Sequence, residues 1–446
     1  MNLRRYRYVA ASRRAAAVTA LGALLTAGTL AAPGPAAAGS GPETGQGTGQ
    51  GTGQGTGLGT RLDRAALSRS LDAVHEAGMY GVYSAVRDGE ESWRDAAGVA
   101  DVDTGRPVKP FMVHRVGSIS KTFTAVALLR QVARGTVELD APIGRYLPDL
   151  VPGERGRRIT VRMLLNHTSH IADHVAQAFP SLTQGSTSSL DDNRLRSFDS
   201  AELVRGALAA PATGEPGALP GVYSNTNYIL AGLLLEKVTG EDAEAHITRE
   251  VIRRAGLRHT SFPRTPNIPG PHSGAYESMY GLIDPPRDYS VYDMSWITTA
   301  GAVVSTMEDL NQFYRALLRG RLLGPAELAE MQKTVPVLLG GYPSPYGLGI
   351  YATDLPCGRF WGHSGSVFGM GTESMSSPDG TRQMSIGMNR TKYQPLDENG
   401  FPAASPIDPA LVVHLLEGLC GPATARTRAA EPSFVPFAVD RISVKR

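Results

Sequence analysis

Residues 115–125 read Arg-Val-Gly-Ser-Ile-Ser-Lys-Thr-Phe-Thr-Ala, and this stretch places Ser118 and Lys121 three residues apart. The apolar residues that continue to Val132 predict a helix over 118–132 that is hydrophobic nearly all round and so lies buried between layers. Side chains at i and i+3 share one helix face, so the amine can take the proton of the hydroxyl. The alternative is a helix-capping serine followed by a solvated lysine.

Two further triplets, Tyr223-Ser224-Asn225 and His363-Ser364-Gly365, supply the remaining chemistry of acyl transfer. This reaction requires a nucleophile, a base, donors to the oxyanion and a proton donor for the leaving group. We assign Ser118 as the nucleophile, at a helix N-terminus that favours developing negative charge. Lys121 and the phenol of Tyr223 form the base pair, and Tyr223 protonates the leaving group. Burial beside other cations favours the neutral amine that a base needs.

The same triplets predict how the substrate is held. Asn225 is expected to bind the Lys121 amine and the substrate amide. His363 and Ser364 are expected on an edge strand, where an extended substrate pairs with the backbone. The amides of Ser118 and Ser366 would form the oxyanion hole. A serine–histidine–acid triad that uses the histidine is the alternative, but no Gly-x-Ser-x-Gly elbow precedes a matching histidine.

His167, His170 and His174 have a spacing that superficially resembles metal ligands. We expect no metal and no cofactor. The segment is interpreted as the end of a short helix that supports the pocket wall, with His167 hydrogen-bonded internally.

Residues 1–38 have the pattern of an export signal, with five arginines, an apolar run and small residues before a cut after Ala38. The pair Arg13-Arg14 leaves a twin-arginine route open, and an uncleaved anchor over 15–32 is the alternative. Residues 39–60 repeat Gly-Thr-Gly-Gln and are expected to form a flexible linker. The protein is therefore expected to be secreted.

The charge balance excludes some partners. The chain of 446 residues has 44 basic and 42 acidic side chains, and loss of the five leader arginines turns the net charge from +2 into −3. No long basic stripe remains, so neither nucleic acid nor an anionic membrane is expected as a partner. The substrate must be recognised by a pocket.

The domain is expected over 61–425, followed by a tail, 426–446, that is disordered or trimmed. The pattern predicts an α/β (α+β) fold in which an antiparallel sheet and its helices come from both chain ends, with a mostly helical insertion over about 141–286. Strands are expected at 80–86, 96–102, 301–305, 346–351, 359–363, 367–375 and 383–388. Helices are expected at 62–74, 161–166, 201–209, 223–238, 241–255, 307–318 and 409–419.

Cys357 and Cys420 are the only cysteines, and an even count in an exported chain favours a disulfide. Two buried thiols are the alternative. A disulfide between them would link the last helix to the sheet and stabilise the fold by about 4 kcal/mol in the chain-entropy model.

With these motifs the chain resembles the penicillin-recognising serine hydrolases, which comprise class C β-lactamases, related esterases and secreted D-alanyl-D-alanine carboxypeptidases. The last group looks closest. The resemblance covers about 61–425 and includes Leu-Leu-Asn-His-Thr-Ser, Met294-Ser-Trp296, Tyr346-Gly-Leu-Gly and Asp354-Leu-Pro-Cys-Gly. It implies a covalent acyl-enzyme, peptidoglycan peptides ending in D-Ala-D-Ala as substrate, and β-lactams as acylating inhibitors. A monomer is expected.

The resemblance also implies that Trp296 lines the pocket, although an ordinary core tryptophan is the alternative. Ser364 and Ser366 stand where relatives carry threonines, and their hydroxyls can meet a substrate carboxylate. The chain departs from the carboxypeptidases at 350–353, where Ile-Tyr-Ala-Thr offers no arginine for that carboxylate, and at His170, which replaces a glycine. Residues 175–198 match no family motif.

The expected function is a D-Ala-D-Ala carboxypeptidase, with transpeptidation as an extension. An esterase or D-aminopeptidase, supported by the missing arginines, and a class C-like β-lactamase are the alternatives on the same machinery. A binding module without turnover is disfavoured because Ser118, Lys121 and Tyr223 are all present.

Overall fold

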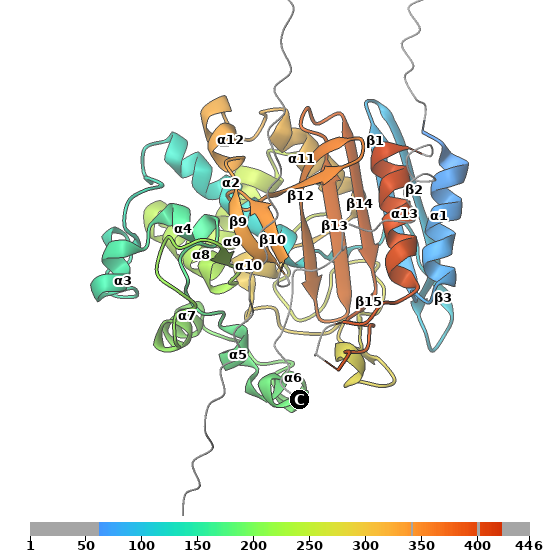
Figure 1. The fold of residues 1–446 in the computed structure, drawn as a ribbon, viewed down its shortest axis with the longest axis horizontal. Coiled ribbons are helices and arrows are strands. Elements are labelled where there is room, and N and C mark those ends of the chain that lie inside the picture. Colours follow the sequence, from blue (N-terminus) through green and yellow to red (C-terminus); the bar gives the residue numbers. More distant parts are fainter. Residues whose placement is uncertain (1–61, 340–341, 399–401, 422–446) are drawn as a thin grey trace, which may run out of the picture. The chain divides into compact units, whose positions relative to one another are not determined.

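Strands from both ends of the sequence form one ten-stranded sheet in the computed structural model, which describes residues 62–339, 342–398 and 402–421 (Figure 1). The order is β3-β2-β1-β14-β13-β12-β11-β10-β9-β5, and all neighbours are antiparallel except β5 and β9. The strands are β1 Gly81–Asp88, β2 Glu91–Asp101, β3 Arg106–Pro107, β5 Gly221–Val222, β9 Val335–Leu339, β10 Tyr342–Tyr346, β11 Tyr351–Leu355, β12 Gly358–Val367, β13 Met370–Ser376 and β14 Arg382–Met388.

Helices cover both faces of this sheet. On one face α1 (Arg64–Glu76) and α13 (Ile407–Cys420) lie side by side, and their apolar residues pack with those of β1 and β14 in one core cluster. On the other face α11 (Met307–Leu318) packs on β1, β13 and β14, and its apolar side chains join those of α2 (Ser120–Ala133) in the larger cluster. Capping by Asp63 and Thr306 fixes where α1 and α11 begin. The predicted fold class is confirmed.

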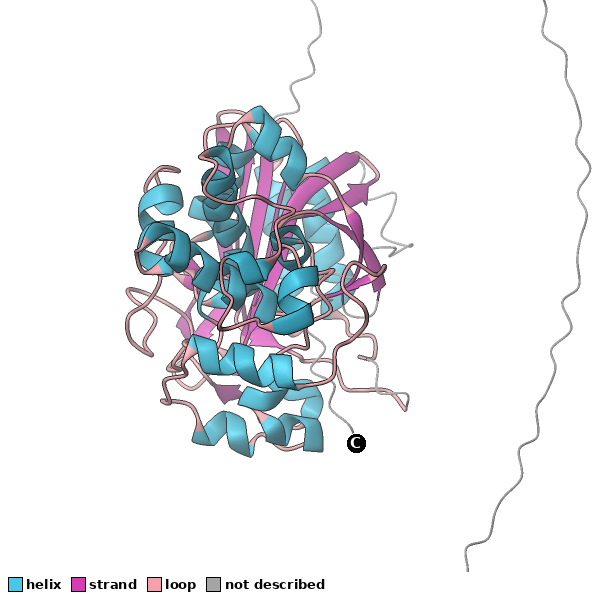
Figure 2. Cartoon of the chain, turned by 90° about the vertical axis from the view of Figure 1, so that its left-hand side faces the viewer, coloured by secondary structure: helices cyan, strands magenta, loops and turns pink. Residues whose placement is uncertain are grey.

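A helical region from residues 141–286 lies beside the sheet, and Figure 2, which faces that side, shows helices in front of the strands. Its helices are η2 Ile143–Arg145, α3 Gly153–Arg158, α4 Val161–Leu165, α5 Val175–Ala178, η3 Pro180–Gln184, α6 Ser188–Asp192, α7 Ser200–Ala209, α8 Thr226–Thr239, α9 Ala243–Ile247, η4 Thr248–Ile252 and η5 Met279–Gly281. The remaining elements are β4 His114–Arg115, η1 Gly117–Ile119, β6 Tyr276–Glu277, β7 Arg287–Asp288, α10 Thr298–Gly301, β8 Val304–Ser305, α12 Pro325–Met331 and β15 Arg390–Thr391.

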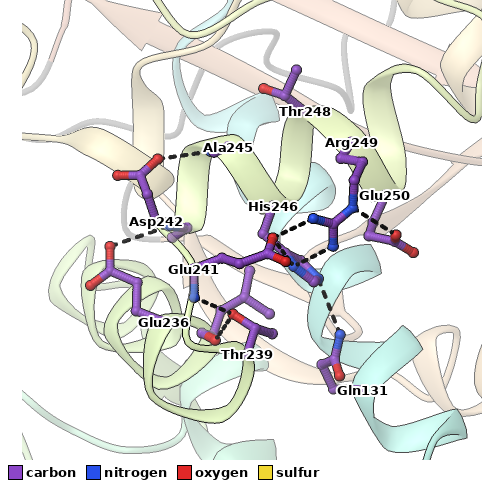
Figure 3. A network of polar contacts seen from close by, with 12 residues as sticks. Gln131, Glu236, Thr239, Glu241, Asp242, Ala245, His246, Thr248, Arg249 and Glu250 are labelled. Carbon is purple, nitrogen blue, oxygen red and sulfur yellow. Dashed lines mark hydrogen bonds and ion pairs between the residues drawn. The ribbon is translucent and has the colours of Figure 1, made fainter.

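The far end of α2 is tied to α9 and η4 by a polar network (Figure 3). Gln131 lies 3.1 Å from Nε2 of His246, whose Nδ1 lies 3.2 Å from Glu241. Arg249 then bridges Glu241 and Glu250. Nδ1 of His246 also lies 3.2 Å from the Arg249 guanidinium. These contacts fix the end of α2 that is remote from the nucleophile.

Two predicted strands are wrong. The predicted strand 346–351 is a tight turn between β10 and β11, in which the Gly347 amide donates to Ile350 at 2.7 Å. Gly349, at a φ of 74°, lets this turn approach α2, because an added Cβ would lie 2.6 Å from Ala125. The predicted strand 301–305 shrinks to β8, because its first residue ends α10.

The predicted edge position of the His363-Ser364-Gly365 strand is also wrong. β12 lies between β11 and β13 in the interior of the sheet. Its described ladder with β11 ends at Gly362, however, whereas its ladder with β13 continues to Val367. The stretch after Gly362 therefore pairs on the β13 side and turns its other side toward the start of α2.

Cys357 and Cys420 form a disulfide with their Cα atoms 5.5 Å apart, which joins the β11–β12 connection to the end of α13. The helices of the described ranges include none with the length and apolar character needed to cross a bilayer. The predicted leader (1–38), linker (39–60) and tail (426–446) lie outside the described residues.

Candidate active site

Ser118 lies in the single turn η1 that leads into α2, and Lys121 lies one turn later. Both are buried, with exposed fractions of 4% and 0%, and their Oγ and Nζ atoms are 2.9 Å apart. Ser120 holds the turn, because its hydroxyl donates to the Gly117 carbonyl and accepts from the Val303 amide. The predicted contact between hydroxyl and amine is therefore present.

Lys121 has two further oxygen neighbours. Its Nζ lies 2.7 Å from Oδ1 of Asn225 and 2.9 Å from the carbonyl oxygen of Ala300. A carbonyl and an amide oxygen can only accept, so they take two N–H bonds. The third neighbour, the Ser118 hydroxyl, can accept from the amine or donate to it, according to which of the two groups holds the proton. The geometry accommodates proton transfer from Ser118 to Lys121.

Asp173 is a site residue that the sequence analysis missed. Its Oδ2 accepts from the backbone amide and the side-chain Nδ2 of Asn225, at 2.9 and 2.8 Å. Since a carboxylate only accepts from the amide nitrogen, it orients the Asn225 oxygen toward Lys121. The signal was available, because Asp173 stands between His170 and His174 in the segment weighed for metal binding.

Tyr223 and Asn225 lie in the connection between β5 and α8 rather than in the predicted helix over 223–238, which begins at Thr226. The amide of Ser224 donates to Nδ1 of His167 at 3.2 Å, and the Asn225 amide donates to Asp173. These side-chain acceptors hold the triplet outside the helix. The Tyr223 ring faces the Lys121 amine, with 4.9 Å from Nζ to the ring centroid.

The His167 ring packs against the Tyr223 ring, and His167 is hydrogen-bonded internally, as predicted. The two ring centroids are 4.2 Å apart. Burial, and secondly the charge of Lys121, holds the pKa of His167 well below its usual value, so the ring is neutral.

The predicted oxyanion donors, the amides of Ser118 and Ser366, lie on two backbone segments that touch through glycines. A Cβ on Gly117 would lie 2.7 Å from the Ser366 nitrogen, and a Cβ on Gly365 would lie 2.8 Å from the Ser118 nitrogen. Only residues without side chains allow this approach. Both amides therefore border the nucleophile, where they can donate to an oxyanion.

His363 is fixed in one tautomer. Its Nδ1 lies 2.5 Å from the Ser364 carbonyl, which only accepts, so this nitrogen carries the proton and Nε2 accepts from Oη of Tyr346 at 2.9 Å. Burial, and secondly the charge of Lys121, lowers its pKa to about 3. Both nitrogens are committed away from Ser118, so the alternative triad is not supported.

The remaining predicted substrate-binding residues differ in exposure. Ser366 is half-buried, whereas Ser364 and Trp296 are buried, with exposed fractions of 1% and 5%. The Trp296 indole stacks on Phe368, with 5.0 Å between ring centroids, within the larger core cluster. Pocket lining by Trp296 remains a prediction.

The three histidines of the 167–174 segment point to separate partners. His170 contacts Thr213 and Ala218, and His174 bonds to the Trp296 carbonyl at 2.7 Å. His170 adopts a φ of 55°, in the left-handed region that favours glycine. Within the described ranges no group of three or more His, Cys, Asp or Glu residues could hold a metal ion.

The chain is similar to known hydrolases. A solved D-stereospecific amidohydrolase from Streptomyces sp. is 33% identical, with a TM-score of 0.69 over 81% of this chain and 99% of that chain. Esterase EstB of Burkholderia gladioli is 34% identical over 45% of this chain and 53% of its own length. A D-aminopeptidase of Cereibacter sphaeroides is 26% identical over 71% of this chain and 58% of its own length. The chain spans between half and two thirds of the length of these two curated relatives.

The beta-lactamase family model matches residues 64–403, which is most of the chain and contains each of the three motifs. The chain therefore belongs to the beta-lactamase family and is a serine hydrolase of the β-lactamase and penicillin-binding-protein type.

Proposed function

We propose that this serine hydrolase cleaves amides or esters whose acyl part is a D-amino acid. The observation that carries the proposal is the contact of Lys121 with Ser118, Asn225 and Ala300, which holds the amine within hydrogen-bond distance of the serine hydroxyl. The similarity to the amidohydrolase and the D-aminopeptidase supports the D-configured acyl part.

The reaction begins when the Ser118 Oγ attacks the substrate carbonyl carbon and its proton passes to Lys121. The oxyanion accepts from the amides of Ser118 and Ser366. The carbon–nitrogen or carbon–oxygen bond then breaks, and the leaving group takes a proton through the phenol of Tyr223, which regains it from Lys121. Water attacks the resulting ester by the same route in reverse, releasing the acid and restoring the Ser118 hydroxyl.

Asp173 supports an acyl part with a free amino group. Its side chain is about one third exposed, and it lies next to Asn225, which would bind the substrate amide. A carboxylate in this position attracts an ammonium group on the acyl side of the substrate.

Cleavage of D-Ala-D-Ala peptides is the second candidate. The Cys357–Cys420 disulfide is compatible with it, because Cys357 belongs to the Asp354-Leu-Pro-Cys-Gly stretch that carries the resemblance to the secreted carboxypeptidases. Secretion, a peptidoglycan substrate, acylation by β-lactams and a monomeric state remain proposals that rest on the sequence.

The test incubates the purified protein and its Ser118→Ala variant with D-alaninamide, L-alaninamide, D-alanyl-D-alanine peptides and a p-nitrophenyl ester. We expect D-selective release of ammonia or alcohol by the wild type and none by the variant. Equal cleavage of both alaninamide enantiomers, or release of D-alanine from the peptides alone, would contradict the proposal.

A further inference from the structure

A buried carboxyl lies beside the strand that borders the nucleophile. Glu373 on β13 is the register partner of Ser364 on β12, so both side chains leave the same face of the sheet. The exposed fraction of Glu373 is 1%. Tyr351, which is paired with Gly362 at the start of β11, donates its Oη proton to Oε1 of Glu373 at 2.8 Å.

Oε2 of Glu373 lacks a hydrogen-bond partner within the described residues, and the side chain of Ser364 contacts the phenol of Tyr351. Buried polar atoms are ordinarily paired, so an unpaired atom next to a site calls for an explanation. In the sequence, Tyr351 stands out only as a position without arginine. The structure adds that its hydroxyl is directed to a carboxyl.

The position of Tyr223 identifies which part of the substrate passes Ser364. The oxyanion amide of Ser366 fixes the scissile carbonyl, and Tyr223 protonates the leaving group. The Tyr223 ring lies beside His363 at the start of this segment, with 6.4 Å between ring centroids, whereas the ring of Phe368, which follows the segment, packs on Trp296 and Tyr292. The leaving group therefore extends from Ser366 along Ser364, and the acyl group extends the other way.

From these contacts we propose that Glu373, through Tyr351 and Ser364, makes the site select leaving groups without a carboxylate. The preferred substrates are then D-aminoacyl amides and esters with uncharged leaving groups, and peptides with a free C-terminal carboxylate become poorer substrates once Glu373 is ionised. This inference rests on the proposed acyl transfer at Ser118.

Within the described part of the chain, the groups that contact Glu373 carry no positive charge. Its neighbour on β14 is Ile386, the phenols of Tyr351 and Tyr314 come from β11 and α11, and His363 on β12 is neutral. Burial raises the pKa of Glu373 to about 8, and the bond from Tyr351 opposes this only in part. The carboxyl is therefore uncharged in acid and gains a negative charge near pH 8, which repels a substrate carboxylate.

The test uses two substrates that differ in the carboxylate alone, D-alanyl-D-alanine and D-alanyl-D-alaninamide, each also in Nα-acetyl form. Release of D-alanine or D-alaninamide gives kcat/KM from pH 6 to 10 for the wild type and Glu373→Gln. The acid and the amide of each pair have the same amino end. Titration of that end therefore largely cancels in the ratio of their kcat/KM values.

We expect the wild type to prefer the amide, and the preference to grow by about tenfold as the pH rises through 8. In Glu373→Gln the rise should vanish, an effect that a general loss of packing would not produce. A wild-type ratio near one, or a rise that persists in the variant, would overturn the inference. If none of the four compounds is cleaved and Ser118 is not acylated, the proposed function fails instead.

Discussion

Replacing Glu373 by Gln should change how the stability of the protein depends on pH. The side chain is fully buried, and its pKa rises from 4.5 to about 8 on folding. Between these values the folded protein binds more protons than the unfolded chain, so the free energy of unfolding falls as pH rises. The glutamine variant keeps the acceptor for Tyr351 and cannot ionise.

The size of this change in unfolding free energy follows from the difference of about 3.5 pKa units between the unfolded and folded states, because each pKa unit corresponds to about 1.4 kcal/mol. Most of this falls between pH 5 and pH 9, where the carboxyl should cost the wild type about 4 kcal/mol relative to the variant. Urea unfolding followed by tryptophan fluorescence at the two pH values measures it, because the other titrating groups cancel in the difference.

Glu76→Gln is the matched control, because Glu76 is exposed on α1. Its unfolding free energy should follow the wild type at both pH values. If Glu373→Gln also follows the wild type from pH 5 to pH 9, then the carboxyl does not stay protonated in the folded protein. The electrostatic account of this part of the site would then be refuted.

Three further changes test other parts of the structure. Gly365→Ala places a Cβ against the Val116 carbonyl and the Ser118 amide, so kcat should fall about 100-fold or more. Circular dichroism should show that the fold is retained. In the control Gly206→Ala the added Cβ has room, so kcat should stay near the wild-type value. Replacing both cysteines by serine opens a link over 63 residues and should lower the free energy of unfolding in urea by about 4 kcal/mol; an unchanged midpoint would show that the disulfide stabilises nothing. His363→Gln should leave the acidic limb of the kcat/KM profile in place, since the pKa of about 3 keeps the ring neutral across the assay range, and a displaced limb would contradict the assigned tautomer.

The three motifs were predictable because each is a short run of neighbouring residues. Together they supply the nucleophile, the base and the proton donor that acyl transfer needs. Ser118, Tyr223 and His363 stand on separate segments, and the fold brings them together as expected. The amide positions of Ser118 and Ser366 also follow the prediction, because Gly117 and Gly365 mark a close backbone approach.

The parts that could not be predicted depend on tertiary pairing. The interior position of β12 depends on partners on both sides, and the alternation of β12 alone does not reveal them. Asp173 stands in a loop whose histidines suggested a metal, and its partner Asn225 is 52 residues away. Glu373 looks like an ordinary strand residue until the register places it opposite Ser364.

The central claim is that Ser118 carries a covalent acyl group during turnover and that Lys121 removes its proton. Rapid quenching in acid during steady-state hydrolysis of a p-nitrophenyl D-aminoacyl ester, followed by intact mass and peptide mapping, tests it most directly. We predict one acyl adduct, on the peptide that contains Ser118, and a loss of about 100-fold or more in its rate of formation in Lys121→Ala. An adduct on another residue, or near-wild-type acylation in Lys121→Ala, would contradict the account.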